Sequence, residues 1–289
     1  MILVTAATGQ VGREVVRRLA GAGPVRAMVR DPATAGDLDG ADIGVASFED
    51  SRAMGAAMAG AETVFLAGRD SPDYIAHQER AIAAARAAGV RHVVKLSALG
   101  ARPRSPVELM RDHHAVEERL RGSGMPWTFL RPHLYMQNLL RFAGPVAAGG
   151  RLAAPMGDGG YPFVDTRDVA AAAAAVLRDP ADHAGRAYAL TGPRAVRYAE
   201  VAARMGEIAG RDVRYEPLAP ERFRAELEAA GVPAWRAADL AAIASAYTEA
   251  ENRPADGVRE LTGRPPAPVE RFLEDHRAML LAGASRSHR

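Results

Sequence analysis

Hydrophobic residues in the first half of the chain follow two alternating spacings. Short runs rich in β-branched residues predict six strands, at Ile2–Val4, Val25–Val29, Ile43–Ala46, Thr63–Leu66, His92–Leu96 and Trp127–Leu130. The longer segments between them, such as 11–19 and 109–120, carry apolar residues at helical spacing. Ser51 is expected to cap a short helix over Arg52–Met58, and Gly89 to end the helix before the fifth strand. The pattern predicts an α/β fold of the Rossmann type, with a doubly wound parallel sheet covered by helices on both faces.

After about residue 140 the pattern changes. Glycine-rich turns are expected at 144–145, 149–150 and 157–160, followed by a helix at Thr166–Leu177 and a strand at Ala187–Leu190. Later elements are predicted at Tyr198–Ala209, Val213–Glu216 (a strand), Pro220–Ala230, Pro233–Tyr247 and Pro268–Leu281. We therefore expect a first domain over residues 1–150 and a smaller, mainly helical lobe over 151–289, with the segment 160–195 returning to the first domain.

A glycine-marked turn follows the first strand directly. Thr8-Gly9-Gln10-Val11-Gly12 opens the first helix, where backbone N–H groups and the positive helix end can bind a pyrophosphate. Gly9 would let the ligand approach the backbone, and Gly12 would let the helix pack close to the sheet. Ala6 stands where the motif usually has its first glycine. An ordinary strand-to-helix turn is the alternative, but the position after an N-terminal strand favours dinucleotide binding.

The end of the second strand bears on which dinucleotide is bound. NAD-binding proteins of this type carry an acidic residue about 20 residues after the glycines, which receives the ribose hydroxyls. Here the strand ends at Arg30, a cation suited to a 2′-phosphate, with Asp31 one step beyond. A simple surface arginine is the alternative in so arginine-rich a chain. The sequence favours NADP(H), with NAD(H) as the weaker choice.

Composition narrows the class of protein. The 289 residues are 48% apolar and 25% charged, which is typical of a globular chain, and the net charge is only +2 with basic residues spread throughout. No nucleic-acid surface is therefore expected. The absence of cysteine excludes disulfides and thiolate chemistry. The longest apolar run, Val169–Leu177, is too short to span a bilayer, and no leader precedes the first strand, so we expect no membrane partner and a cytoplasmic location.

Several strings in this order resemble the NmrA-like group of atypical short-chain dehydrogenase/reductases. The resemblance covers most of the chain and lies in Thr8–Gly12, Val29–Pro32, Ala88–Ser97, Ser123–Pro132, Val164–Ala170, Leu190–Pro193 and Leu261–Pro266. It implies a Rossmann domain, a small C-terminal lobe and a cleft between them. The glycine turn would hold the cofactor diphosphate and Arg30 the 2′-phosphate. The chain departs from the family at Ala6 and at Ser47, where an aspartate is usual.

The resemblance also places the rest of the cofactor. Phe48, after the third strand, would flank the adenine. Ala67 and Gly68, after the fourth strand, would pass beneath the ribose. Ser97 and Ala98, after the fifth strand, would lie near the nicotinamide.

The single lysine of the chain restricts the chemistry. Classical members of the superfamily use a tyrosine proton donor with a lysine four residues later, but Arg91 stands four residues before Lys95. Alcohol oxidation, carbonyl reduction and sugar epimerisation by that mechanism are therefore disfavoured. Lys95 itself lies in a predicted strand and is expected to be structural or near the cofactor.

A histidine and a carboxylate share one face of the helix that follows the fifth strand. His113 and Glu117 are spaced i, i+4, as are His114 and Glu118. A histidine backed by a carboxylate can deliver a proton near neutral pH. By resemblance, His113–Glu117 is the pair that fits the His-x-x-x-Glu arrangement of NmrA-like reductases. An ion pair or a solvated face is the alternative, and two residues on one helix supply too few ligands for a metal.

The resemblance makes the segment Pro132–Asn138 one wall of the substrate pocket. Tyr135 would stack on the substrate or donate a proton, with core packing as the alternative. Asn138 is a candidate polar contact or a loop cap, and His133 faces the cleft or the surface. Asp165 is expected to cap the helix at Thr166 rather than to act in the reaction.

Together these features predict an NADPH-dependent oxidoreductase. It would transfer hydride to a small electrophilic acceptor such as a quinone, azo, imine or conjugated carbonyl compound, with the protein supplying proximity and orientation. The alternative is a non-catalytic NADP(H)-sensing regulatory protein that binds a protein partner, as some NmrA-like members are. Reductases of this general kind often pair through helices, so a homodimer is a further expectation.

Overall fold

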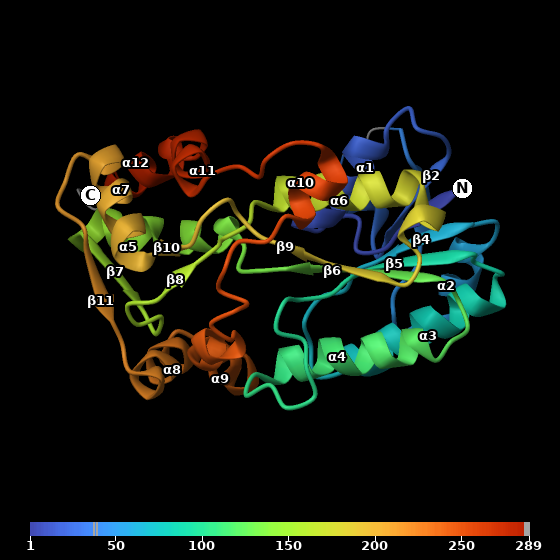
Figure 1. Cartoon of the computed structure of the whole chain (residues 1–289), viewed down its shortest axis with the longest axis horizontal. Coiled ribbons are helices and arrows are strands. Elements are labelled where there is room, and N and C mark those ends of the chain that lie inside the picture. Colours follow the sequence, from blue (N-terminus) through green and yellow to red (C-terminus); the bar gives the residue numbers. More distant parts are fainter. Residues whose placement is uncertain (37, 39, 286–289) are drawn as a thin grey trace.

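A seven-stranded parallel sheet forms the centre of the protein (Figure 1). The computed structural model describes residues 1–36, 38 and 40–285. The strands are β1 (Ile2–Val4), β2 (Val25–Val29), β3 (Asp42–Val45), β4 (Thr63–Leu66), β5 (His92–Leu96), β6 (Trp127–Pro132) and β9 (Arg186–Leu190). Their order is β3-β2-β1-β4-β5-β6-β9, and every neighbouring pair is parallel. From β1 the strand order runs outward in one direction to β3 and in the other direction from β4 to β9. In sheets of this kind, ligands bind at the carboxyl ends of the strands beside such a switch point.

Helices cover both faces of this sheet, which confirms the predicted Rossmann-type fold. One face carries α1 (Gln10–Leu19), α6 (Thr166–Arg178) and α10 (Gly257–Thr262), and the other carries α2 (Ser51–Met58), α3 (Tyr74–Ala87) and α4 (Glu108–Arg121) (Figure 1). Neighbouring residues of one strand enter opposite cores: Val94 packs on the α1–α6 side and Val93 on the α3–α4 side. Burial on both faces explains why these strands are continuous apolar runs.

A second cluster of elements extends from one end of the sheet (Figure 1). Its strands form two small ladders, β7 (Arg151–Ala154) with β11 (Arg214–Pro217) and β8 (Gly160–Tyr161) with β10 (Val196–Arg197). Its helices are η2 (Met136–Phe142), α5 (Ala143–Gly149), α7 (Tyr198–Ala209), α8 (Pro220–Ala229), α9 (Ala234–Ala242), η4 (Ile243–Ala246), α11 (Val269–Asp275) and α12 (Arg277–Ser285). Short 3₁₀ turns η1 (Pro32–Thr34) and η3 (Pro180–His183) complete the chain. No helix of the described residues is long and apolar enough to cross a bilayer.

Three local predictions were wrong, and one strand was missed. Asp50, not Ser51, caps α2, and its carboxylate accepts the Ala53 N–H at 2.9 Å. A helix, α5, replaces the turn expected at 144–145. Pro145 is compatible with it because this residue lies in the first helical turn, where a missing N–H leaves no helical hydrogen bond unmade. The strand β7 was not predicted. The helix expected over Pro268–Leu281 is broken at His276 into α11 and α12.

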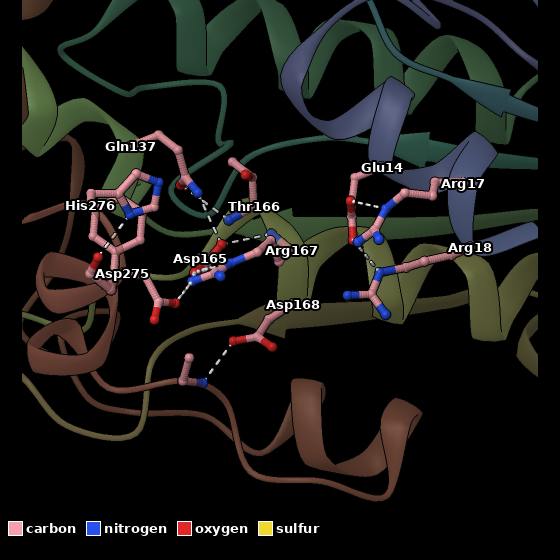
Figure 2. A network of polar contacts seen from close by, with 12 residues as sticks. Glu14, Arg17, Arg18, Gln137, Asp165, Thr166, Arg167, Asp168, Asp275 and His276 are labelled. Atoms are coloured by element: carbon pink, nitrogen blue, oxygen red, sulfur yellow. Dashed lines mark hydrogen bonds and ion pairs between the residues drawn. The ribbon is translucent and has the colours of Figure 1, made fainter. Parts of the chain in front are cut away.

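A network of polar contacts ties the start of α6 to the C-terminal elements (Figure 2). Asp165 caps α6 by accepting the Arg167 N–H at 2.8 Å, as predicted. The Arg167 guanidinium bridges this carboxylate and that of Asp275 in α11. Gln137 of η2 donates to Asp165 at 2.9 Å. The helix α6 and the strand β9 lie in the layers of the large sheet, whereas β8 pairs with β10 outside it. The boundary near residue 150 and the return of segment 160–195 to the first domain stay predictions.

Candidate active site

A cavity of about 700 Å³ opens at the carboxyl edge of the sheet, beside the switch point between β1 and β4. Most of the residues singled out from the sequence line it: Gly9, Gln10, Val11, Gly12, Ala67, Gly68, Ser97, Ala98, His113, His133, Tyr135 and Asn138. Four others, Thr8, Arg30, Phe48 and Glu117, stand outside this lining. The structure thus gathers residues from four strand ends and the lobe around one hollow. Their contacts with a cofactor or substrate stay predictions.

The glycine turn forms a cradle at one end of the cavity. Gly9 is exposed and precedes the first turn of α1, and no side chain of the described residues caps that turn. The first N–H groups of the helix therefore point to a ligand site with the positive end of the helix dipole. A Cβ at Gly12 would stand 2.3 Å from the carbonyl oxygen of Ala6, so only glycine lets α1 sit this close to the strand end. These features fit a dinucleotide diphosphate.

Ala6 occupies a backbone conformation that suits glycine. Its φ angle is +47°, in the left-handed region, where a side chain costs about 1–2 kcal/mol. Ala6 therefore adopts the backbone conformation of the usual glycine turn, but with conformational strain.

The variant Ala6→Gly should release this strain. Because glycine also makes the unfolded chain more flexible, we expect a net gain of about 0.5 kcal/mol in the free energy of unfolding. NADPH affinity, if the turn binds it as proposed below, should be retained. Chemical denaturation and calorimetry measure the two quantities. A loss of stability would contradict the assignment of strain to Ala6.

Thr5 joins the two loops that flank the switch point. Its hydroxyl donates to the Ala67 carbonyl at 2.7 Å and accepts the Ala67 N–H at 2.8 Å, and the side chain is fully buried. The end of β1 is therefore held in register with the end of β4. Gly68, the next residue, lies close to α3: a Cβ there would stand 2.4 Å from Nε2 of buried Gln78, so a larger residue would require the Gln78 side chain to move.

Glu117 is a structural anchor of the site rather than the partner of His113. Its buried carboxylate accepts from the Ser97 hydroxyl at 2.6 Å and from Arg131 Nε at 2.9 Å, and it also pairs with Arg121 at 3.2 Å. No hydrogen bond or ion pair joins it to His113 within the described residues. The expected backing of the histidine by this carboxylate is thus not formed. Glu117 instead holds Ser97 at the cavity edge.

His113 finds its partner on another helix. Its Nδ1 lies 3.2 Å from the Tyr74 hydroxyl, and burial lowers the pKa of the imidazole well below its usual value. The ring is therefore neutral. Tyr74 belongs to α3, and its hydroxyl also contacts Lys95, although the residue four positions before Lys95 is Arg91 and not a tyrosine.

Lys95 lies fully buried beneath the floor of the cavity. Its Nζ donates to the Tyr74 hydroxyl at 2.9 Å, to the Leu96 carbonyl at 3.0 Å and to Gln78 Oε1 at 3.4 Å. Burial lowers the pKa of this ammonium to about 7, against the attraction of nearby Glu117 and Asp70, which raises it.

The predicted wall at Pro132–Asn138 is aromatic. His133 is buried and not on the surface: its Nδ1 accepts the Leu134 N–H at 2.8 Å, and its ring stacks on Tyr247 with centroids 4.0 Å apart. Burial lowers the pKa of His133 to about 3, so it stays neutral. Tyr135 is half-buried, and burial raises the pKa of its phenol. Asn138 lies exposed at the rim.

The opposite wall comes from lobe residues that sequence reasoning missed. Phe163, Tyr198, Arg236, Leu240 and Tyr247 also line the cavity. They carry no local motif, since only the folding of the lobe against the sheet places them there. Arg236 and Leu240 belong to α9, and a third residue of this helix, Asp239, binds the N-terminus of α4. The Asp239 carboxylate accepts the N–H groups of residues 108 and 109, each at 2.9 Å.

Residues 1–273 match the family model described as the NmrA-like family. The chain belongs to the NmrA-like family. Curated members similar to it include (4-alkanoyl-5-oxo-2,5-dihydrofuran-3-yl)methyl phosphate reductase of Streptomyces griseus, 40% identical over 96% of this chain and 98% of the relative. An NAD(P)H azoreductase of Xenophilus azovorans is 36% identical over 96% and 98%, respectively. Quinone oxidoreductase 2 of Escherichia coli is 35% identical over 81% and 83%.

Similar solved structures share the whole fold. An NADPH-dependent quinone oxidoreductase from Escherichia coli, in complex with NADPH, superposes with a TM-score of 0.87 at 30% identity, covering 96% of this chain and 99% of that one. The triphenylmethane reductase of a Citrobacter species, in complex with NADP(H), gives 0.84 at 26% identity, covering 98% and 100%. The likeness extends through both the sheet and the lobe.

Proposed function

We propose that this NmrA-like protein is an NADPH-dependent reductase that transfers hydride to a small electrophilic acceptor, such as a quinone, azo, imine or conjugated carbonyl compound. The observation that carries the proposal is one continuous cavity, with an uncapped glycine turn at one end and an aromatic, histidine-bearing pocket at the other. Relatives named as quinone, azo and furanone-phosphate reductases support it, as do two similar structures that hold NADPH or NADP(H).

The sheet edge supplies the cofactor site. The N–H groups at residues 9–12 would hold the diphosphate and Arg30 the 2′-phosphate, with Phe48 beside the adenine. Ala67 and Gly68 would lie under the ribose, and Ser97 and Ala98 near the nicotinamide. When bound, NADPH supplies the hydride.

The lobe and α4 supply the acceptor site. Tyr135 and Asn138 would contact the acceptor, and the neutral ring of His133 would close the wall as an apolar, stacked surface. His113 lines the same cavity and would give the proton that the reduced acceptor needs. A bound acceptor would displace water from this cavity, which would strengthen the polar contacts inside it.

The function is tested with the purified protein, NADPH, and a panel that contains menadione and an azo dye. We expect acceptor-dependent loss of NADPH absorbance and, in calorimetry, heat from NADPH binding without acceptor. Tight NADPH binding with no turnover on any acceptor would instead support a cofactor-sensing regulator. No binding of either reduced or oxidised coenzyme would contradict the cofactor site itself.

Arg30 should decide between the two nicotinamide cofactors. It is exposed directly after β2. A hydrogen bond to a charged phosphate contributes about 1.5 kcal/mol or more to binding. Its loss in Arg30→Gln should therefore raise the KM for NADPH about tenfold. The KM for NADH should not change. Arg86→Gln, an exposed arginine of α3, is the matched control. Equal effects on both cofactors would remove Arg30 from the 2′-phosphate site.

Three expectations about the setting of the reaction stay predictions: the cytoplasmic location, the homodimer and the absence of a nucleic-acid partner. Size-exclusion chromatography with light scattering tests the second directly.

A further inference from the structure

A row of three titratable side chains runs from the sheet to the cavity. Lys95 of β5 donates to the Tyr74 hydroxyl of α3 at 2.9 Å, and that hydroxyl lies 3.2 Å from Nδ1 of His113 on α4. Lys95 and Tyr74 are almost completely shielded from solvent, whereas His113 lines the cavity. Three elements of the fold thus contribute one residue each to a continuous line of hydrogen bonds.

The hydrogen-bond partners fix the direction of this line. The Lys95 amine has three acceptors around it, which match the three N–H groups of an ammonium. Burial raises the pKa of the Tyr74 phenol well above its usual value, so the phenol keeps its proton. Since its oxygen accepts from Lys95, its O–H is free to donate to His113 Nδ1. His113 is then the neutral tautomer with its hydrogen on Nε2.

We propose that Lys95 and Tyr74 form a proton relay that recharges His113 during reduction of the acceptor; this rests on the proposed reductase function. Hydride addition leaves the acceptor with a negative charge. The Nε2 proton of His113 moves to the acceptor, the Tyr74 phenolic proton moves to Nδ1, and a Lys95 ammonium proton moves to the phenol oxygen. Lys95 ends as the neutral amine and is reprotonated by water along the same line, in reverse, once the product leaves.

Lys95 and Tyr74 are positioning residues in this scheme, because they act only through His113. The relay replaces the usual tyrosine–lysine pair of the superfamily with one assembled from two separate elements. It gives the only lysine of the chain a task that arginine cannot perform, since a guanidinium does not lose its proton in proteins.

The pH dependence follows from the groups around Lys95. Tyr74 and Gln78 face it from α3, His113 and Glu117 from α4, and Asp70 from the loop after β4. With a pKa of about 7, the ammonium is present below that pH and is lost above it. The rate with a proton-requiring acceptor should therefore fall as the pH rises through about 7.

Two acceptors separate proton delivery from hydride transfer. Menadione needs a proton after hydride addition. Crystal violet, a triarylmethyl cation, becomes a neutral product on hydride addition alone. In Tyr74→Phe and Lys95→Met we expect the menadione kcat to fall about 100-fold, while crystal violet reduction and the Kd for NADPH stay as in the wild type. In the wild type, only the menadione rate should decline above neutral pH.

Tyr188→Phe is the matched control, because its hydroxyl also contacts a histidine, His183 Nδ1, at 2.7 Å, outside the cavity lining. It should change neither rate. Equal losses with both acceptors in the relay variants, or no loss with either, would overturn the relay, as would identical pH profiles for the two acceptors in the wild type. A wild-type protein that reduces neither acceptor would instead overturn the reductase function.

Discussion

Replacing Arg131 by methionine should lower the free energy of unfolding by about 3 kcal/mol. The Glu117 carboxylate is fully buried, and Arg131 donates to both of its oxygens, from Nε at 2.9 Å and from Nη2 at 2.5 Å. Without Arg131 the buried charge keeps only the Ser97 hydroxyl and one contact from Arg121 at 3.2 Å. A buried charge left short of partners is strongly destabilising. Urea denaturation measures the loss.

The double variant Arg131→Met/Glu117→Leu tests the cause of this effect. It removes the charge along with its partner and should recover most of the lost stability. Arg253→Met, which breaks an exposed pair with Glu249, should change the stability little and is the control. If Arg131→Met were as stable as the control, the buried pair would not hold the site together.

The variant Gly12→Ala should weaken NADPH binding by up to about 100-fold, because a hydrogen bond to a charged group such as the diphosphate contributes about 1.5–3 kcal/mol. The added Cβ would stand 2.3 Å from the Ala6 oxygen and 2.9 Å from its carbonyl carbon, so α1 has to move away from the strand end. The N–H groups proposed for the diphosphate move with it. Calorimetric titration with NADPH measures the loss.

Gly55→Ala is the matched control for Gly12→Ala. Gly55 lies inside α2, and no described atom comes within 4 Å of a Cβ built there. Alanine should raise stability there by up to about 1 kcal/mol and leave NADPH binding unchanged. Unaltered NADPH affinity in Gly12→Ala would mean that the glycine turn does not hold the cofactor.

The large sheet could be predicted from the sequence because its strands are short apolar runs bounded by turns. Six strands were expected within one or two residues of their true ends, as at Trp127–Leu130 against Trp127–Pro132. The strand β7 was missed because Arg151–Ala154 contains two alanines and pairs only with β11, whose sequence lies far along the chain. The cap of α2 was misplaced by one residue, since Asp50 and Ser51 are both good caps and only the backbone decides.

The site was predictable only where its chemistry is local. The glycine turn is a local backbone feature, so its position after β1 was enough to find it. Helical spacing predicted that His113 and Glu117 share one face of α4, and the structure shows that this face is buried, but the spacing could not show their partners. Those partners, Arg131 and Tyr74, come from β6 and α3. The contact between Tyr74 and Lys95 likewise exists only because the topology places α3 beneath β5.

The carboxylate of Asp239 couples the position of α9, which lines the cavity, to that of α4, which bears His113. It occupies the two leading amides of α4 from a helix that itself faces the cavity. Moving α9 away from α4 would remove the acceptor of both amides and loosen the first turn of α4, four to five residues before His113. An acceptor that needs α9 to move would therefore have two disadvantages: it would fit the cavity badly, and it would disturb the helix that carries the proposed proton donor His113.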